Sequence, residues 1–199
     1  MEKSRNSNYP DITAIVIAGG QGQRMNSLDK ALLQWRGRTF VEHIVARLNP
    51  QVSCIAINSN TASAPLQALG LPLLPDPFVD RRGPLAGILA GLNFSKTALT
   101  LFVPCDNPLL PDDLIERLLE ALTAHNADIA YASCTGDGHY LYALMRSDLR
   151  ISLEQVLQNR DFAVRHWYAA VHAVSVDFSA EADRFININT PDDLALLPQ

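Results

Sequence analysis

The chain has 199 residues, of which 48% are apolar and 19% are charged, and its formal net charge at pH 7 is −5. This length allows one domain with a sizeable core, and the acidic balance argues against a protein that binds nucleic acid or a membrane surface over a broad face. A phosphate site would therefore be a local positive patch. We expect a flexible N-terminus over residues 1–10 and a single domain over residues 11–199.

The cysteines and the N-terminus indicate a cellular compartment. Cys54, Cys105 and Cys134 are odd in number, widely spaced and free of any C-x-x-C pair. This pattern predicts reduced thiols rather than a disulfide framework or a zinc site. The first eleven residues lack the apolar core of a signal peptide, and no stretch approaches the roughly 20 apolar residues of a transmembrane helix. We expect a cytoplasmic protein.

The first strong element is an apolar, β-branched run over residues 12–18, which predicts a strand buried on both faces. Residues 19–22 then read Gly-Gly-Gln-Gly. Glycines allow tight turns and leave backbone N–H groups open to a polyphosphate, and Arg24 and Lys30 supply positive charge nearby. This stretch predicts a nucleotide site that works by positioning and charge neutralisation.

Two common glycine loops do not fit this stretch. A Rossmann fingerprint needs G-x-G-x-x-G and an acidic residue at the end of the next strand, whereas this loop reads GGQGQR and the next strand ends at Asn58. A P-loop needs G-x-x-x-x-G-K-[ST], and the chain contains no such string. The sequence therefore argues against a hydride-transfer enzyme with a dinucleotide cofactor.

Helix and strand patterns alternate after the loop. They predict a helix, a buried strand, a short helix and an interrupted edge strand, over residues 40–48, 52–57, 64–69 and 71–77. Thr39 can cap the first helix, and the edge strand brings Asp76 to its end. The alternation implies parallel strands with helices on both faces of a sheet.

A second glycine-containing segment precedes the next helix, which we expect from Pro84 to residue 94. Gly83, Pro84 and Leu85 shape the helix start, where unpaired N–H groups and the helix dipole favour the phosphates or polar groups of a nucleotide. Proline at the start of a helix is also a routine structural device. From the residues alone, a binding role and a structural role both stand.

Asp106 follows a strong strand over residues 99–103. Ligands of open α/β sheets bind at the carboxyl ends of strands, and a strand-end carboxylate with a glycine loop and a lysine suits a magnesium triphosphate. Asp106 is therefore our candidate magnesium ligand. The alternative is that Asp106 caps a turn before a helix over residues 112–122.

In the last third of the chain, two strands over residues 128–133 and 140–146 are joined by a hairpin-like link over residues 134–138. Two helices over residues 149–157 and 162–168 and a late strand over residues 170–176 follow. The hairpin would add an antiparallel strand. Residues 185–189 predict a short strand on which Asn187 and Asn189 face one side and offer amide oxygens to a metal or an acceptor phosphate, and Thr190 can cap a final helix.

Several motifs carry a resemblance to one family. The loop resembles the L-A-G-G-x-x-x-R-M-x-x-x-D-K signature of nucleotidyltransferases, and the matching residues are Ile17, Ala18, Gly19, Gly20, Arg24, Met25, Asp29 and Lys30. The strings G-P-L-A-G-I, P-C-D-x-P and F-x-N-x-N-T-P-x-D-L follow in order at residues 83–88, 104–108 and 185–194. The family also reads H-P-hydrophobic-x-A-L where this chain has Tyr140 after His139. From residue 13 to residue 194 the chain resembles the molybdenum cofactor guanylyltransferases.

The resemblance implies a fold and a reaction. The fold is a single three-layer α/β/α domain of the nucleotide-diphospho-sugar transferase type, with a mostly parallel Rossmann-like sheet and an antiparallel strand. The reaction transfers GMP from GTP to the terminal phosphate of molybdopterin and releases pyrophosphate. Implied partners are GTP, molybdopterin and, transiently, molybdenum-insertion proteins and molybdoenzyme chaperones, but neither nucleic acid nor membrane.

The resemblance and the residue patterns together give a set of candidate site residues. Lys30, Asp106 and Arg24 are the catalytic candidates, with Mg²⁺ on Asp106. The nucleotide-binding candidates are Ile17, Ala18, Gly19, Gly20, Lys30, Asn58, Asp76, Gly83, Pro84, Leu85 and Asp106. The acceptor-binding candidates are Asn187, Asn189 and His139, although a lone strand-end histidine is more often structural.

Three other functions fit the same residues. A sister enzyme that uses CTP on molybdopterin, or a nucleotidyltransferase acting on a sugar or alcohol phosphate, would keep the loop and Asp106. A non-catalytic GTP-binding module would bind the nucleotide without releasing pyrophosphate, but Lys30 and Asp106 argue for catalysis.

Overall fold

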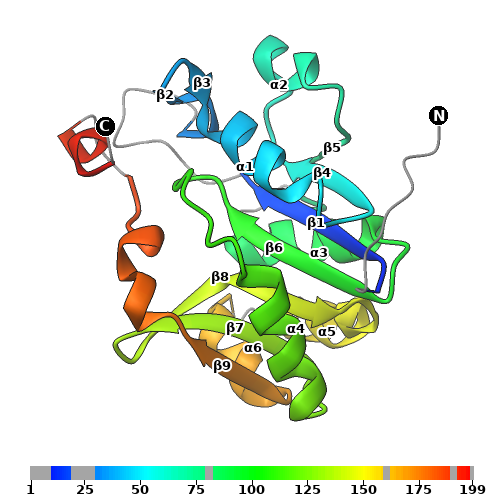
Figure 1. The fold of residues 1–199 in the computed structure, drawn as a ribbon. Helices are drawn as coiled ribbons and strands as arrows, with labels where there is room; N and C mark the ends of the chain where they lie inside the picture. The colour runs from blue at the N-terminus through cyan, green and yellow to red at the C-terminus, as the bar shows by residue number, and fades with distance from the viewer. Residues whose placement is uncertain (1–9, 19–29, 79–82, 159–161, 189–191, 198–199) are drawn as a thin grey trace.

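The computed structural model describes residues 10–18, 30–78, 83–158, 162–188 and 192–197 (Figure 1). Seven strands form one sheet in the order β5-β4-β1-β6-β8-β7-β9. They are β1 (Ile12–Ile17), β4 (Cys54–Asn58), β5 (Leu73–Leu74), β6 (Leu99–Pro104), β7 (Ile129–Cys134), β8 (Asp137–Arg146) and β9 (Ala173–Asp177). Only β8 runs antiparallel to its neighbours in this sheet. The predicted mostly parallel sheet with one antiparallel strand is confirmed.

Helices cover both faces of the sheet (Figure 1). They are α1 (Phe40–Leu48), α2 (Ala64–Ala68), α3 (Pro84–Phe94), α4 (Leu114–Ala124), α5 (Arg150–Gln158) and α6 (Val164–Ala170). Residues of α1 and α4 share one buried cluster with the sheet, and residues of α3, α5 and α6 share a second. The layers are therefore helix, sheet and helix, as predicted.

Short 3-10 helices and a small ribbon complete the described fold. The 3-10 helices are η1 (Lys30–Leu32), η2 (Ser147–Leu149), η3 (Ser179–Phe185) and η4 (Asp192–Leu196), and the ribbon pairs β2 (Gln34–Trp35) with β3 (Arg38–Thr39). No helix in the described part of the chain has the length and apolar character needed to cross a membrane.

The central strand β1 explains why the sheet is covered on both faces. All six of its residues are buried. Ile12, Ala14 and Val16 pack into one apolar cluster, and Ile15 and Ile17 pack into the other. A strand whose side chains alternate between two cores is mainly apolar, and the one polar residue of β1, Thr13, accepts a hydrogen bond from the Thr97 hydroxyl at 2.9 Å.

Helix α1 begins with the predicted cap and holds the segment that contains Lys30. The Thr39 hydroxyl accepts a hydrogen bond from the Glu42 N–H at 3.3 Å, and the Glu42 carboxylate accepts one from the Thr39 N–H at 2.7 Å. Leu33 donates its N–H to the Lys30 carbonyl at 3.2 Å and accepts from the Phe40 N–H at 2.8 Å. These backbone bonds join η1 to the start of α1.

Some predicted elements are wrong or displaced. The structure has no strand at the described residues 186–188, because the N–H of Ile188 bonds the Asp106 carbonyl rather than a neighbouring strand. The late strand begins at Ala173 rather than at residue 170, since α6 continues to Ala170. Helix α4 begins at Leu114, two residues later than predicted.

Other predictions hold with different lengths or lie outside the described residues. The edge strand keeps only its two residues β5, because prolines flank it at positions 72 and 75. The hairpin link is a two-residue turn in which Thr135 and Gly136 both have positive φ, which suits a tight hairpin. The proposed flexible segment before Pro10 and the Thr190 cap lie outside the described residues.

Candidate active site

The carboxyl ends of β1, β4 and β6 meet at one edge of the sheet. The Ala18 N–H donates to the Asn58 carbonyl at 2.8 Å, and the Cys105 N–H donates to the Ile17 carbonyl at 3.0 Å. These bonds continue the parallel pairing just past the strand ends. They bring Ile17, Ala18 and Asn58 together with the segment that leads to Asp106, at the edge where open α/β sheets bind ligands.

Asn58 and Asp76 form a hydrogen-bonded pair at this edge. The Asn58 side chain is only 1% exposed, and its amide donates to the Asp76 carboxylate at 2.9 Å and to the Leu74 carbonyl at 3.0 Å. The other Asp76 oxygen accepts from the Asn60 amide at 2.7 Å, and Asn60 in turn accepts from the Asp76 N–H at 2.8 Å. Both carboxylate oxygens of Asp76 are thus held in fixed positions.

Helix α3 packs closely over this pair. A Cβ atom at Gly87 would lie 2.3 Å from the Asn58 side-chain oxygen, so only glycine fits there without a shift. The helix begins after Gly83, whose φ is 62°, and Gly83 and Pro84 are exposed. Leu85 is fully buried in the core. Of these three predicted nucleotide-binding residues, only Gly83 and Pro84 are therefore accessible to a ligand from solvent.

Asp106 lies two residues after the end of β6 at Pro104, at the predicted strand end. One of its carboxylate oxygens is buried and has no hydrogen-bond partner among the described residues. Burial raises the pKa of Asp106 above its ordinary value, and the positive charge of Lys30 lowers that pKa partway back. Lys30 therefore lies within electrostatic range of Asp106, and the structure brings these two catalytic candidates together.

The chemistry of Asp106 fits a divalent cation. A buried carboxylate oxygen without a protein donor is a ready ligand, and magnesium commonly takes one or two carboxylates with substrate phosphates completing its shell. The described residues contain no cluster of three or more His, Cys, Asp or Glu that would hold a metal alone. The residues present thus suit a cation that arrives with a polyphosphate.

Asn107, rather than Asp106, caps the turn after β6. Its side-chain oxygen accepts a hydrogen bond from the Leu109 N–H at 2.7 Å. The alternative interpretation, in which Asp106 serves only as a turn cap, is therefore not what the structure shows. The Asp-Asn-Pro string predicted a turn here, but not which of the two side chains forms it.

His139 and the segment after η3 lie next to the Asp106 loop. The His139 ring packs against Phe185, with ring centroids 5.0 Å apart, and burial lowers the pKa of His139 below its ordinary value. The Ile188 N–H donates to the Asp106 carbonyl at 2.9 Å, and Asn187 beside it is exposed. Asn187 thus lies next to a residue bonded to this loop, and His139 packs against Phe185 at the start of the same segment.

Some predicted site residues lie outside the described part of the chain. They are Gly19, Gly20, Arg24 and Asn189. Three residues that sequence reasoning did not select stand at the site instead. Asn60 and Asn107 form the hydrogen bonds given above, and Tyr142 has a fully buried hydroxyl whose pKa is raised by burial and by the nearby Asp106. The signal that could have found them is asparagine at a strand end, near Asn58 for Asn60 and next to Asp106 for Asn107.

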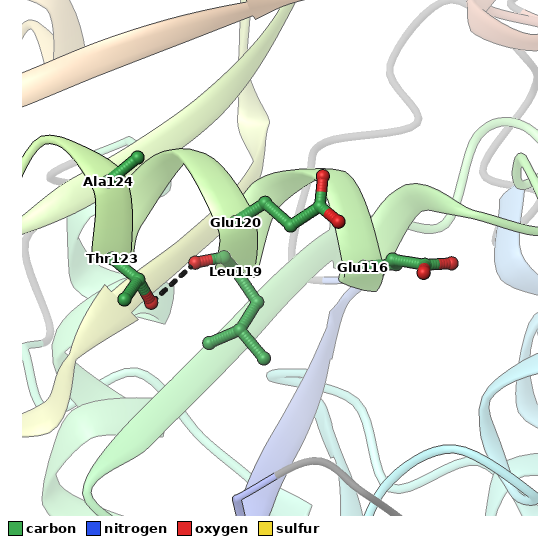
Figure 2. Close-up of a pocket in the computed structure, with 5 residues that line it drawn as sticks. All are labelled: Glu116, Leu119, Glu120, Thr123 and Ala124. Carbon is green, nitrogen blue, oxygen red and sulfur yellow. Dashed lines mark hydrogen bonds between the residues drawn. The ribbon is translucent and has the colours of Figure 1, made fainter.

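A shallow hollow on the outer side of α4 takes no part in this arrangement. Figure 2 shows that one helix supplies its lining, and the Thr123 hydroxyl donates to the Leu119 carbonyl at 2.8 Å within that helix. The lining residues are Glu116, Leu119, Glu120, Thr123 and Ala124, and none is a predicted site residue.

Comparison with known proteins identifies relatives along most of the chain. The family model described as a MobA-like NTP transferase domain matches residues 14–174. A molybdenum cofactor guanylyltransferase of Shewanella loihica is 37% identical over 183 residues, which cover 92% of this chain and 93% of the relative. One of Histophilus somni is 38% identical over 183 residues, covering 92% of this chain and 94% of the relative.

Solved structures share the fold at lower identity. Molybdopterin-guanine dinucleotide biosynthesis protein A of Archaeoglobus fulgidus has a TM-score of 0.75 at 20% identity, covering 92% of this chain and 95% of that one. The 2-C-methyl-D-erythritol 4-phosphate cytidylyltransferase of Thermus thermophilus has a TM-score of 0.68 at 19% identity, with the same two coverages. At this identity the likeness concerns the fold alone.

Proposed function

The chain belongs to the molybdenum cofactor guanylyltransferases of the MobA-like NTP transferase family, and from this membership we propose that it transfers GMP from GTP to molybdopterin. An oxygen of the molybdopterin terminal phosphate attacks the α-phosphorus of GTP. The bond from that phosphorus to the bridging oxygen breaks, and pyrophosphate leaves. The product is the molybdopterin guanine dinucleotide cofactor.

The observation that carries this proposal is the buried carboxylate oxygen of Asp106, which has no partner among the described residues and stands within range of Lys30. A module that only binds a nucleotide has no use for a buried carboxylate beside a lysine. Such a carboxylate repels the bound phosphates unless a cation lies between the carboxylate and the phosphates. Asp106 would hold Mg²⁺, which when bound would neutralise phosphate charge. The arrangement therefore favours catalysis over binding alone.

The chain's own residues divide the work by position. Asn58 and Asp76 line the nucleoside pocket together with Ile17, Ala18 and the exposed start of α3. The family motif assigns Gly19 to the same nucleotide site. Lys30 and Arg24 offset the repulsion between the two anionic substrates, and the residues 19–22 hold the departing phosphates through backbone amides. No general base is required, because the second pKa of a phosphate is about 6 and the attacking group is ionised near neutral pH.

The acceptor lies on the other side of Asp106, where Asn187, Asn189 and His139 bind it. The low pKa of His139 supports a neutral ring, which donates or accepts a hydrogen bond rather than pairing as a cation. We also propose a cytoplasmic location, since Cys54, Cys105 and Cys134 form no disulfide and thiols stay reduced in that compartment. We also propose that residues 11–199 form one domain and that molybdenum-insertion proteins and molybdoenzyme chaperones contact it transiently.

The test is pyrophosphate release by the purified protein with magnesium, molybdopterin and each of the four ribonucleoside triphosphates in turn. Release with GTP alone is the expected result. Release with CTP alone would assign the protein to a cytidylyl-transferring branch. Binding of GTP without release from any nucleotide would indicate a binding module and overturn the proposed reaction.

Two variants test the residues. Asp106→Ala and Lys30→Ala should each abolish most turnover and leave the circular dichroism spectrum unchanged, since both side chains act on phosphate charge. The matched controls are Asp148→Ala and Lys96→Ala, which change exposed residues away from the site and should keep the normal rate. Near-normal turnover in either test variant would contradict the assignment.

A further inference from the structure

Asn107 joins two segments of the chain that lie far apart in sequence. Its side chain is 0% exposed. The side-chain oxygen accepts from the Leu109 N–H at 2.7 Å, within the loop after β6, and the amide nitrogen donates to the Arg184 carbonyl at 2.7 Å, at the end of η3. A single buried amide therefore fixes the Asp106 loop internally and attaches a segment 77 residues further on to it.

The attached segment, residues 184–188, has a second bond to the same loop. The Ile188 N–H donates to the Asp106 carbonyl at 2.9 Å. The Ile188 side chain is fully buried in a small cluster with Phe40 and Leu109. Both ends of the segment are thus held by two consecutive residues, Asp106 and Asn107, and Asn187 is exposed between the two attachments.

This geometry sets the distance between the two halves of the site. In the proposed function Asp106 stands on the nucleotide side and Asn187 on the acceptor side. Two links join them, the Ile188 bond to the Asp106 carbonyl and the Asn107 amide bond to the Arg184 carbonyl. In-line attack requires that the acceptor oxygen and the α-phosphorus be held near contact distance, and a misplacement of about 1 Å can cost about a hundredfold in rate. A buried amide with two bonds of 2.7 Å is suited to hold such a spacing.

We propose that Asn107 is a positioning residue for nucleotidyl transfer, which keeps residues 184–188 and their acceptor-binding side chain in register with Asp106. This inference rests on the proposed function. It assigns to Asn107 no contact with either substrate. Asn107 acts through the Arg184 carbonyl on one side and through the Leu109 turn on the other.

The decisive variant is Asn107→Ser. A serine hydroxyl can still accept from the Leu109 N–H, because Ser supports the same local turn, but it is too short to reach the Arg184 carbonyl. We expect the KM for molybdopterin to rise about fivefold to tenfold and kcat to fall, while the Kd for GTP measured without acceptor stays within about twofold. The matched control is Asn93→Ser, which changes an exposed asparagine on α3 and should move none of these values.

A readout independent of turnover separates the inference from the proposed function. Amide hydrogen exchange at Ile188 should be faster in Asn107→Ser than in the wild type, because the segment then opens more often. This measurement needs no substrate, so it reports on Asn107 even if the wild type fails to release pyrophosphate. Asn107→Asp, which keeps the shape and the Leu109 bond but loses the donor, serves as the second variant if the serine protein does not fold.

The results that would overturn the inference are specific. Unchanged exchange at Ile188 would show that Asn107 does not hold the segment. Faster exchange with unchanged molybdopterin KM and kcat would show that the segment does not position the acceptor. An equal loss of GTP affinity and acceptor affinity would show a merely structural role for the whole loop.

Discussion

Gly87 offers the sharpest test of how α3 and the Asn58–Asp76 pair work together. In the Gly87→Ala variant the new Cβ would lie 2.3 Å from the Asn58 side-chain oxygen and 2.9 Å from its carbon, so Asn58 has to move. Asn58 carries two hydrogen bonds, to Asp76 and to the Leu74 carbonyl. We expect the variant to lose these bonds and to release Asp76 from its fixed orientation.

The cost to stability can be worked from these contacts. Overpacking costs about 1–3 kcal/mol and two hydrogen bonds about 1 kcal/mol each, whereas replacing a helical glycine by alanine returns about 1 kcal/mol. The net loss in the free energy of unfolding is therefore about 2–4 kcal/mol. For a chain of this size that loss lowers Tm by about 5–15 °C. The KM for GTP should also rise about tenfold, because Asp76 no longer meets the nucleoside in its fixed orientation.

Gly91 provides a matched control one helical turn away. A Cβ there would meet Phe102 at 2.6 Å and Ile15 at 2.8 Å, which are core side chains away from the site. Gly91→Ala should therefore lower Tm but leave the KM for GTP unchanged. The measurements are thermal unfolding and initial rates of pyrophosphate release for both variants. An unchanged KM for GTP in Gly87→Ala, or an equal rise in both variants, would refute the reasoning.

Three further predictions follow from single contacts. Burial raises the pKa of Asp106, so the stability linked to its neutral form is complete below the unfolded pKa of about 3.9 and is lost as pH rises through the folded pKa. Asp106→Asn should therefore raise the Tm of the ligand-free protein at pH 7 but not below about pH 4. Equal Tm values for the variant and the wild type at pH 7 would contradict this. Asn60→Ala removes both hydrogen bonds between Asn60 and Asp76. In steady-state assays the KM for GTP should rise about threefold to tenfold at constant kcat. A fall in kcat with an unchanged KM would argue against this role of Asn60. Thr39→Ala should lower Tm by about 2–4 °C through loss of the capping box of α1. Ser63→Ala should leave Tm unchanged, because the Ser63 side chain forms no capping bond at the start of α2. Equal Tm shifts in the two variants would contradict the assigned role of Thr39.

Local patterns predicted the elements well where one segment determines its own structure. The apolar run of β1, the Thr39 cap and the strand-end position of Asp106 each depend on residues close together in sequence, and the structure confirms them. The Asn107 bond to Arg184 joins residues 77 positions apart, and no local pattern encodes it. The same holds for the pair of Asn58 and Asp76, whose bond depends on the neighbouring strands β4 and β5.

The absence of the predicted strand at the described residues 186–188 has a related cause. Alternation of Ile and Asn is equally compatible with a strand and with an extended segment that crosses strand ends, because both place alternate side chains on opposite sides. What decides between them is the partner of the backbone N–H groups, and for Ile188 that partner is the Asp106 carbonyl. The alternation of the sequence is not kept in the structure, because Ile186 is 37% exposed whereas Ile188 is fully buried.

The departure from the family motif at Tyr140 is explained by an irregularity in β8. Tyr131 pairs with Ala143 and Ala132 pairs with His139, so residues 140–142 have no partner in β7. A proline lacks the N–H that a ladder needs, but a residue inside this bulge gives up no bond to β7. Tyr140 instead stacks on Tyr131, with ring centroids 5.1 Å apart. A residue other than proline at position 140 therefore leaves His139 paired with Ala132 in the ladder and packed against Phe185.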